Sequence, residues 1–119
     1  MGEQLGYKKL FVWQKADQFA FEIYGVSEGF PRKEMFGLTS QLRRAALSIP
    51  TNLAEGQGRQ GRKEFRQFVN IALGSATEVE YLLGFACRLK YLDEKACVRL
   101  QGFRREVSSL LWKLLQSLS

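Results

Sequence analysis

The chain has 119 residues, a formal net charge of +6 at pH 7 and no histidine, and its residues are 45% hydrophobic and 25% charged. This length and balance are typical of one ordinary globular domain with a single core, and they argue against long-range disorder. No apolar run reaches the roughly 20 residues of a membrane-spanning helix, and the N-terminus lacks the apolar stretch of a secretory signal. We therefore expect a cytoplasmic protein that does not enter a membrane.

Apolar residues at helical spacing predict the first helix over residues 12–28, and no stretch of the chain alternates with the period of a β-strand. The sequence Gly29-Phe30-Pro31 closes this helix. Pro31 either begins the next helix or opens a short irregular turn that continues through Phe36, because proline at a first helical position loses no needed donor.

The second helix is expected over residues 37–57, and it carries two rows at the same spacing. One row is apolar and must be buried: Leu38, Leu42, Ala45, Ile49 and Leu53. The other row is made of hydrogen-bonding side chains: Gln41, Arg44, Ser48, Asn52, Glu55 and Arg59. Pro50 interrupts the helix and removes one hydrogen bond, so the segment is either a kinked continuous helix or two shorter ones. We favour the kink, because Ser48, Thr51 and Asn52 can satisfy nearby backbone groups.

A glycine-rich turn over residues 56–61 leads into a third helix over residues 62–90, about eight turns long. A short connection follows, in which Asp93 is a plausible N-cap for a fourth, leucine-rich helix over residues 93–117. Four helices of similar length with short connections predict an all-α fold, an antiparallel up-down-up-down four-helix bundle. The whole chain, residues 1–119, then forms one domain.

Aromatic residues at helical spacing are expected to pack mostly in the core: Trp13, Tyr24, Phe65, Phe68, Phe85, Phe103 and Trp112. Tyr81 falls outside this pattern, so it is expected to line an exposed surface.

The residues that usually carry enzyme chemistry are missing or isolated. Without histidine the chain lacks the commonest general base and the usual catalytic triads, and two cysteines cannot complete a structural zinc site. Cys87 and Cys97 flank the expected turn between the third and fourth helices, so a disulfide is geometrically conceivable. In a chain without a secretion signal, two reduced thiols are the favoured interpretation. We expect no catalytic residues, no metal and no cofactor.

Positive charge is concentrated in the middle of the chain. Between Arg32 and Arg66, eight basic residues accompany three acidic ones, which gives this segment a net charge of +5. Such a concentration favours a polyanion, although it also suits a solubilising surface. If it binds RNA or DNA, the candidate contacts are Arg43, Arg44, Arg59, Arg62, Lys63 and Arg66.

The alternative for the polar row is structural. Arg43, Arg44, Glu55 and Arg59 then pair among themselves or across subunits. In this interpretation an oligomer interface or internal polar network is formed by Gln41, Ser48, Asn52 and Glu55.

Several motifs together suggest a family: Leu10-x-Val12-Trp13-Gln14-Lys15-Ala16, Phe30-Pro31-x-x-Glu34-x-x-Gly37-Leu38, Gln41-x-Arg43-Arg44-Ala45, Ser48-Ile49-Pro50-x-Asn52-x-Ala54-Glu55-Gly56-x-x-Arg59, Phe65-x-x-Phe68 and Ala72-x-Gly74-Ser75-x-x-Glu78. Over nearly its whole length the chain resembles the four-helix bundle proteins encoded within intervening sequences of bacterial 23S ribosomal RNA genes. Phe36 stands where a typical relative has tyrosine, and Leu53 where isoleucine is common. Neither difference weakens the resemblance.

The resemblance implies a left-handed bundle and a homopentameric barrel, without an established enzyme activity. Similar proteins include the accessory variability determinants of diversity-generating retroelements, which bind nucleic acid and assist a reverse transcriptase. We therefore expect a non-enzymatic homo-oligomer, a pentamer, that binds RNA or DNA with low sequence specificity. The alternative is a protein–protein adaptor for a nucleic-acid-processing enzyme such as a reverse transcriptase.

Overall fold

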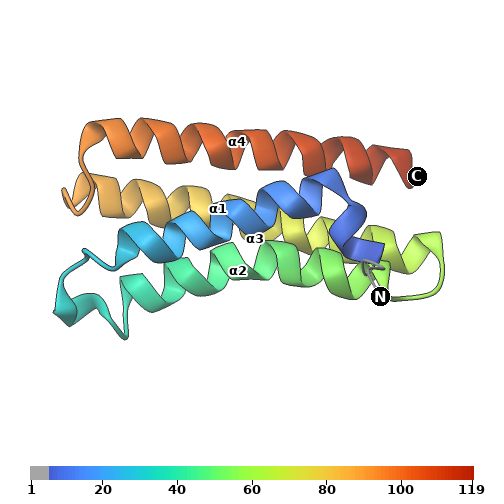
Figure 1. Cartoon of the computed structure of the whole chain (residues 1–119), viewed down its shortest axis with the longest axis horizontal. Helices are drawn as coiled ribbons and strands as arrows, with labels where there is room; N and C mark the ends of the chain where they lie inside the picture. The colour runs from blue at the N-terminus through green and yellow to red at the C-terminus, as the bar shows by residue number, and fades with distance from the viewer. Residues whose placement is uncertain (1–5) are drawn as a thin grey trace, which may run out of the picture.

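Four antiparallel α-helices span the molecule in the computed structural model, which describes residues 6–119 (Figure 1). The elements in chain order are the 3₁₀ turn η1 (Gly6–Lys9), α1 (Phe11–Ser27), the 3₁₀ turn η2 (Arg32–Glu34), α2 (Leu38–Gln57), α3 (Arg62–Arg88) and α4 (Glu94–Ser117). Residues 6–119 contain no strand, which confirms the expected all-α four-helix bundle. The left-handed sense of the bundle stays a prediction.

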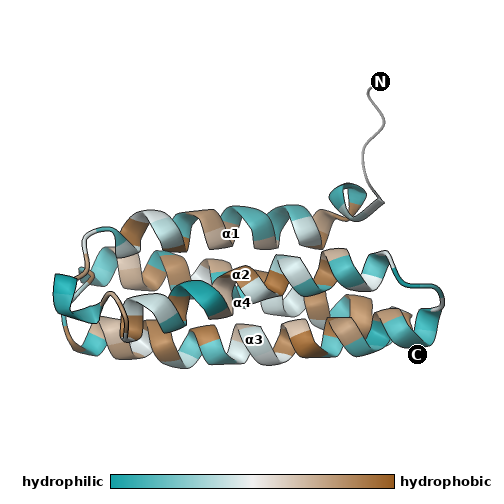
Figure 2. Ribbon diagram, turned by 90° about the horizontal axis from the view of Figure 1, so that it is seen from below, coloured by the Kyte–Doolittle hydropathy of each residue, from teal (hydrophilic) through white to brown (hydrophobic). Residues whose placement is uncertain are grey.

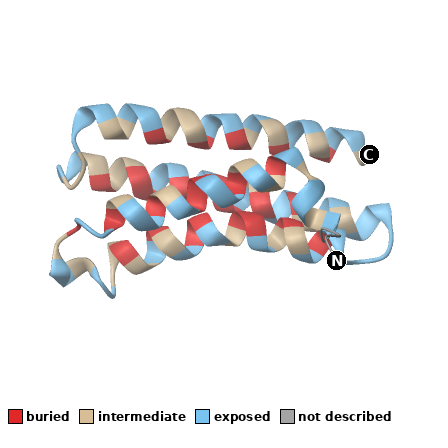
Figure 3. Cartoon of the chain, in the orientation of Figure 1, coloured by how far each residue is buried: buried red, intermediate tan, exposed pale blue. Residues whose placement is uncertain are grey.

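The helices form a closed ring around one core. Each helix packs against the next in the chain, and α1 completes the ring against α4. Buried positions line the inner side of every helix, and hydrophobic residues follow the same inner faces (Figures 2 and 3). The largest side chains that are fully buried are Phe19, Ile23, Leu42, Ile49, Leu53, Leu83, Leu100 and Leu111. The apolar row predicted for residues 37–57 is buried as expected, with only Leu38 partly exposed.

Pro50 lies inside α2, and the helix continues through it. Just after the proline, two short polar side chains bond to carbonyl groups of the preceding turn. Thr51 donates to the Leu47 carbonyl at 2.8 Å, and Asn52 donates to the Ser48 carbonyl at 2.8 Å. As the sequence predicted, these side chains satisfy nearby backbone groups, but neither bond reaches the Ala46 carbonyl, whose amide partner Pro50 removes.

Two aromatic residues expected in the core are exposed. Tyr24 is 38% exposed and Trp112 is 53% exposed, so these predictions were wrong. The leucine-rich fourth helix presents more than one apolar row, and α4 buries the row through Leu111 instead of the one beside Trp112. That row also holds Arg104, which is only 7% exposed and was not anticipated. Tyr81 is exposed, as expected.

The α3–α4 connection confirms one expectation and overturns another. The Asp93 carboxylate accepts the Ala96 amide at 2.8 Å, so Asp93 is the N-cap of α4. Cys87 and Cys97 form a disulfide, so the expectation of two reduced thiols was wrong. The physical reason is the tight hairpin, which brings the two Cα atoms to 6.1 Å, within the range of a disulfide.

Candidate nucleic-acid interface

The antiparallel order of the helices gathers basic side chains from distant parts of the chain at one end of the bundle. The start of α1, the end of α2, the start of α3 and the end of α4 all lie at this end, on the right in Figure 1. We call residues 6–9, 55–66 and 113–119 the basic end. Its seven basic side chains accompany only two acidic ones, Glu55 and Glu64; the basic residues are Lys8, Lys9, Arg59, Arg62, Lys63, Arg66 and Lys113.

Two of these arginines reach the last residues of the chain. Arg62 donates to the Ser117 carbonyl at 2.7 Å, and Arg66 donates to the Ser119 hydroxyl at 3.4 Å. The last carbonyl groups of a helix lack partners within the helix and carry partial negative charge, so a guanidinium is favourable there. Arg62 therefore fixes the beginning of α3 to the end of α4.

Arg59 lies along the α2–α3 seam. Its guanidinium donates to the Glu55 carboxylate at 2.8 Å and lies 5.3 Å from the centre of the Phe68 ring. The hydrogen bond that Arg59 donates to Glu55 raises the pKa of Arg59 above its ordinary value, so the arginine stays charged at physiological pH. Glu55 partly balances this charge, so Arg59 attracts a phosphate less strongly than an unpaired cation does.

The lysines of the basic end are uncommitted. Within residues 6–119, the ammonium groups of Lys8, Lys9, Lys63 and Lys113 make no hydrogen bond or ion pair, and all four residues are exposed. These lysines can approach a polyanion without first breaking a contact. The turn before α3 is set by Gly61, whose φ of 103° is a left-handed conformation that suits glycine and sets the direction in which α3 begins.

The opposite end of the bundle is nearly balanced in charge. Residues 28–34 and 88–95 hold five basic and four acidic side chains. Arg32 and Lys33 lie here, so the central segment with a net charge of +5 does not form one continuous surface. The fold spreads the segment along the bundle, from one end to the other.

Arg43 is held by α1 instead of facing solvent. Its side chain donates to the Ser27 hydroxyl at 2.7 Å, to the Tyr24 carbonyl at 3.1 Å and to the Glu28 carboxylate at 3.3 Å, and its guanidinium lies 4.8 Å from the Tyr24 ring centre. Fourteen residues of α2 separate it from Gln57 at the end of that helix, about 21 Å along the axis. Arg43 therefore holds the last turn of α1 against α2 and is remote from the basic end.

The remaining polar residues of α2 follow the seam with α3. The Ser48 and Ser75 hydroxyl groups lie 2.8 Å apart, and Asn52 donates to the Ser48 hydroxyl at 2.9 Å. This small network joins the two helices within one chain. Gln41 and Arg44 line a shallow hollow of about 260 Å³ with Ser48 and Glu78, and Arg44 makes no hydrogen bond or ion pair within residues 6–119.

Of the four residues expected to pair among themselves, Glu55 and Arg59 do so within one chain, whereas Arg43 pairs with Glu28 and Arg44 makes no ion pair within residues 6–119. Sequence reasoning missed Lys8, Lys9 and Lys113 as members of the basic end. The signal that could have found them is the predicted antiparallel order, because it places both termini beside the glycine-rich turn.

Two further observations concern metal binding and membrane-spanning helices. Within residues 6–119, no group of three or more histidine, cysteine or acidic residues is arranged to hold a metal ion. None of the helices in this range has the length and apolar character required to cross a bilayer.

A family model described as 23S rRNA-intervening sequence protein matches residues 8–113. The chain belongs to this family. Among solved structures, the intervening-sequence protein is similar to the crystal structure of a protein of unknown function from the S23 ribosomal protein family of Bacteroides thetaiotaomicron VPI-5482. The two are 27% identical with a TM-score of 0.81, and the match covers 88% of this chain and 95% of the other. No curated protein matches the chain.

Proposed function

We propose that this intervening-sequence protein is a non-enzymatic homo-oligomer whose basic end binds RNA or DNA with little sequence specificity. The observation that carries the proposal is the gathering of seven basic side chains and only two acidic ones at one end of the bundle. Lysines without a protein partner release counterions from phosphates when they bind. This contribution to the binding free energy does not depend on base sequence.

A homopentamer in the cytoplasm is part of the proposal. Its support is the family membership together with large apolar side chains exposed on every helix: Phe21 on α1, Leu47 on α2, Ile71 on α3 and Val98 on α4. Association of copies buries such surface and places several basic ends in one particle, which raises the local positive charge. Light scattering tests this part, because a dilute monomer of 13.6 kDa contradicts it.

The binding proposal is tested with two matched pairs of substitutions. Lys63→Gln with Lys113→Gln removes two charges from the basic end, and Lys33→Gln with Lys95→Gln removes two from the opposite end. Fluorescence anisotropy with labelled single-stranded RNA and duplex DNA at about 50 mM salt measures affinity. We expect the first pair to weaken binding about tenfold or more and the second to change it little. Equal effects of the two pairs contradict the basic end as the contact surface.

The second candidate is a protein–protein adaptor for a nucleic-acid-processing enzyme such as a reverse transcriptase. It is favoured by two aromatic side chains away from the basic end, Phe21 at 82% exposure and Phe36 at 94%. Exposed aromatic residues are enriched where proteins bind one another. Capture from native cells with and without nuclease separates the candidates, because a partner retained after nuclease treatment supports the adaptor.

A further inference from the structure

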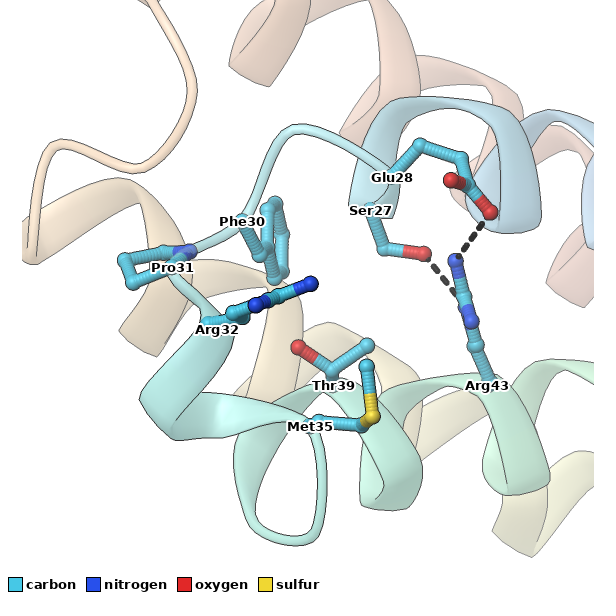
Figure 4. Close-up of a pocket in the computed structure, with 8 residues that line it drawn as sticks. All are labelled: Ser27, Glu28, Phe30, Pro31, Arg32, Met35, Thr39 and Arg43. Atoms are coloured by element: carbon cyan, nitrogen blue, oxygen red, sulfur yellow. Dashed lines mark hydrogen bonds and ion pairs between the residues drawn. The ribbon is translucent and has the colours of Figure 1, made fainter.

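A small cavity lies at the end of the bundle opposite the basic end, between the segment after α1 and the first turns of α2 (Figure 4). Its volume is about 260 Å³. Phe30, Pro31 and Met35 form apolar walls, and Arg32, Thr39 and Arg43 contribute polar groups. This volume is below the range of pockets that take drug-sized molecules, so the cavity suits a smaller ligand.

Thr39 is the feature that the fold alone does not explain. The residue is only 6% exposed, and its hydroxyl oxygen is buried without a hydrogen-bond partner within residues 6–119. In Figure 4 this hydroxyl turns toward Arg32, whose side chain extends into the cavity between Phe30 and Thr39. Buried polar groups in proteins nearly always have a partner, so an unpaired hydroxyl on a residue that lines a cavity points to a ligand that supplies one.

The charges around the cavity leave one cation uncommitted. Arg43 is paired with Glu28 at 3.3 Å. The other nearby carboxylate, Glu34, accepts the Leu38 amide at 3.3 Å and the Tyr91 hydroxyl at 2.8 Å. Within residues 6–119, Arg32 makes no hydrogen bond or ion pair. Among the residues that line the cavity, Arg32 and Arg43 are positive and Glu28 is negative, so a ligand with a single negative charge balances the lining. A doubly charged ligand would exceed that balance and also meet the charge of nearby Glu34.

The side chains of the cavity suit a carboxylate. The Leu38 amide at the start of α2 is already bonded to Glu34, so the contacts to a ligand come from side chains. Arg32 can present two parallel N–H donors to a carboxylate, and the Thr39 hydroxyl can donate a further bond. The apolar walls then contact the remainder of the ligand.

We propose that this cavity binds a small monocarboxylate with a short, branched apolar chain. Arg32 binds the carboxylate, Thr39 donates a hydrogen bond to it, and Phe30, Pro31 and Met35 enclose the apolar part. The site is separate from the basic end and does not depend on nucleic-acid binding.

Calorimetric titration of the full chain with 4-methylpentanoate tests the proposal, with its neutral amide and inorganic phosphate as comparison ligands. We expect the carboxylate to bind and the amide and phosphate to bind at least tenfold more weakly. No binding of 4-methylpentanoate to the unsubstituted protein overturns the site. Equal binding of the amide overturns the ionic contact, and tighter binding of phosphate overturns the ligand class.

Substitutions then assign the contacts. Arg32→Gln is expected to weaken binding about tenfold or more, and Thr39→Val about fivefold without lowering the melting temperature. Lys33→Gln is the matched control, because it removes the same charge from the neighbouring residue, which does not line the cavity. If Thr39→Val fails to fold, the exposed Arg32 still carries the test. The assignment is overturned if Lys33→Gln weakens binding as much as Arg32→Gln.

Discussion

The substitution Gly56→Ala tests the close approach of α2 and α3 beside the basic end. A β-carbon built at Gly56 lies 2.6 Å from the Phe68 β-carbon and 3.0 Å from Cδ1 of Phe65. Favourable carbon contacts lie at about 3.5–4.0 Å, so the two helices must move apart by roughly 1 Å or the phenylalanines must shift. The Phe68 β-carbon is attached to the backbone, so rotation of that side chain cannot relieve the contact.

Two opposing terms determine the magnitude. Alanine is about 1 kcal/mol more favourable than glycine inside a helix, whereas overpacking of a core typically costs about 1–3 kcal/mol. Gly74→Ala and Gly102→Ala are matched controls, because both glycines are helical and their β-carbons meet nothing within 4 Å. Gly56 is the next-to-last residue of α2, so its gain in helix propensity is at most that of the two interior controls. Gly56→Ala is therefore expected to be at least about 1–3 kcal/mol less stable than the controls.

Urea denaturation followed by circular dichroism gives these free energies of unfolding, provided that the m-values of the variants agree. We expect the controls to stabilise the protein by about 1 kcal/mol and Gly56→Ala to leave it unchanged or destabilise it. If Gly56→Ala stabilises the protein as much as Gly74→Ala does, the close α2–α3 contact is refuted.

Three further predictions follow from single contacts. Cys87→Ser removes the disulfide to Cys97, which closes a loop of about ten residues. The free energy of unfolding, measured without reductant, should fall by about 2.7 kcal/mol. Equal stability of the two proteins contradicts the bond. Arg43→Gln should destabilise the protein by roughly 2 kcal/mol in the same assay, because it breaks bonds to the last turn of α1, and an unchanged midpoint argues against that role. The hydrogen bond to Glu34 raises the pKa of Tyr91 above its ordinary value. This pair therefore stabilises the folded protein fully below about pH 10, and the stabilisation is lost as the pH rises through the higher pKa of the folded state. Ultraviolet titration should show a lower tyrosine pKa in Glu34→Gln, and an unchanged titration speaks against the bond.

The helices were predictable because their signals are local. Apolar spacing, the Asp93 cap and the glycines of the turn act within a few residues, so the observed helix boundaries lie within two residues of those expected. The apolar row of α2 was predictable for the same reason, since a single narrow stripe leaves one face to bury. In α4, several apolar rows compete, and the burial of Leu111 and Arg104 beside an exposed Trp112 depends on the packing of α4 against the other helices.

The site was less predictable because its members depend on tertiary geometry. Arg43 and Arg44 are adjacent in the sequence, yet one bonds to α1 and the other lines the α2–α3 hollow. Lys8 and Lys113 join the basic end only because the chain reverses direction at each connection. Thr39 has the spacing of a core residue, and nothing in the sequence indicates that its hydroxyl lacks a partner.

The salt dependence of nucleic-acid binding tests the central claim most directly. The observed association constant for duplex DNA is measured at several salt concentrations between about 50 and 200 mM, for the unsubstituted chain and for the two lysine pairs. We predict a steep fall with salt, and a logarithmic slope that becomes shallower by about 1.8 when Lys63 and Lys113 are replaced, because each lost phosphate contact removes about 0.9 from the slope. The Lys33 and Lys95 pair should leave the slope unchanged. No binding at low salt, or a slope that the Lys63 and Lys113 pair does not alter, contradicts the account.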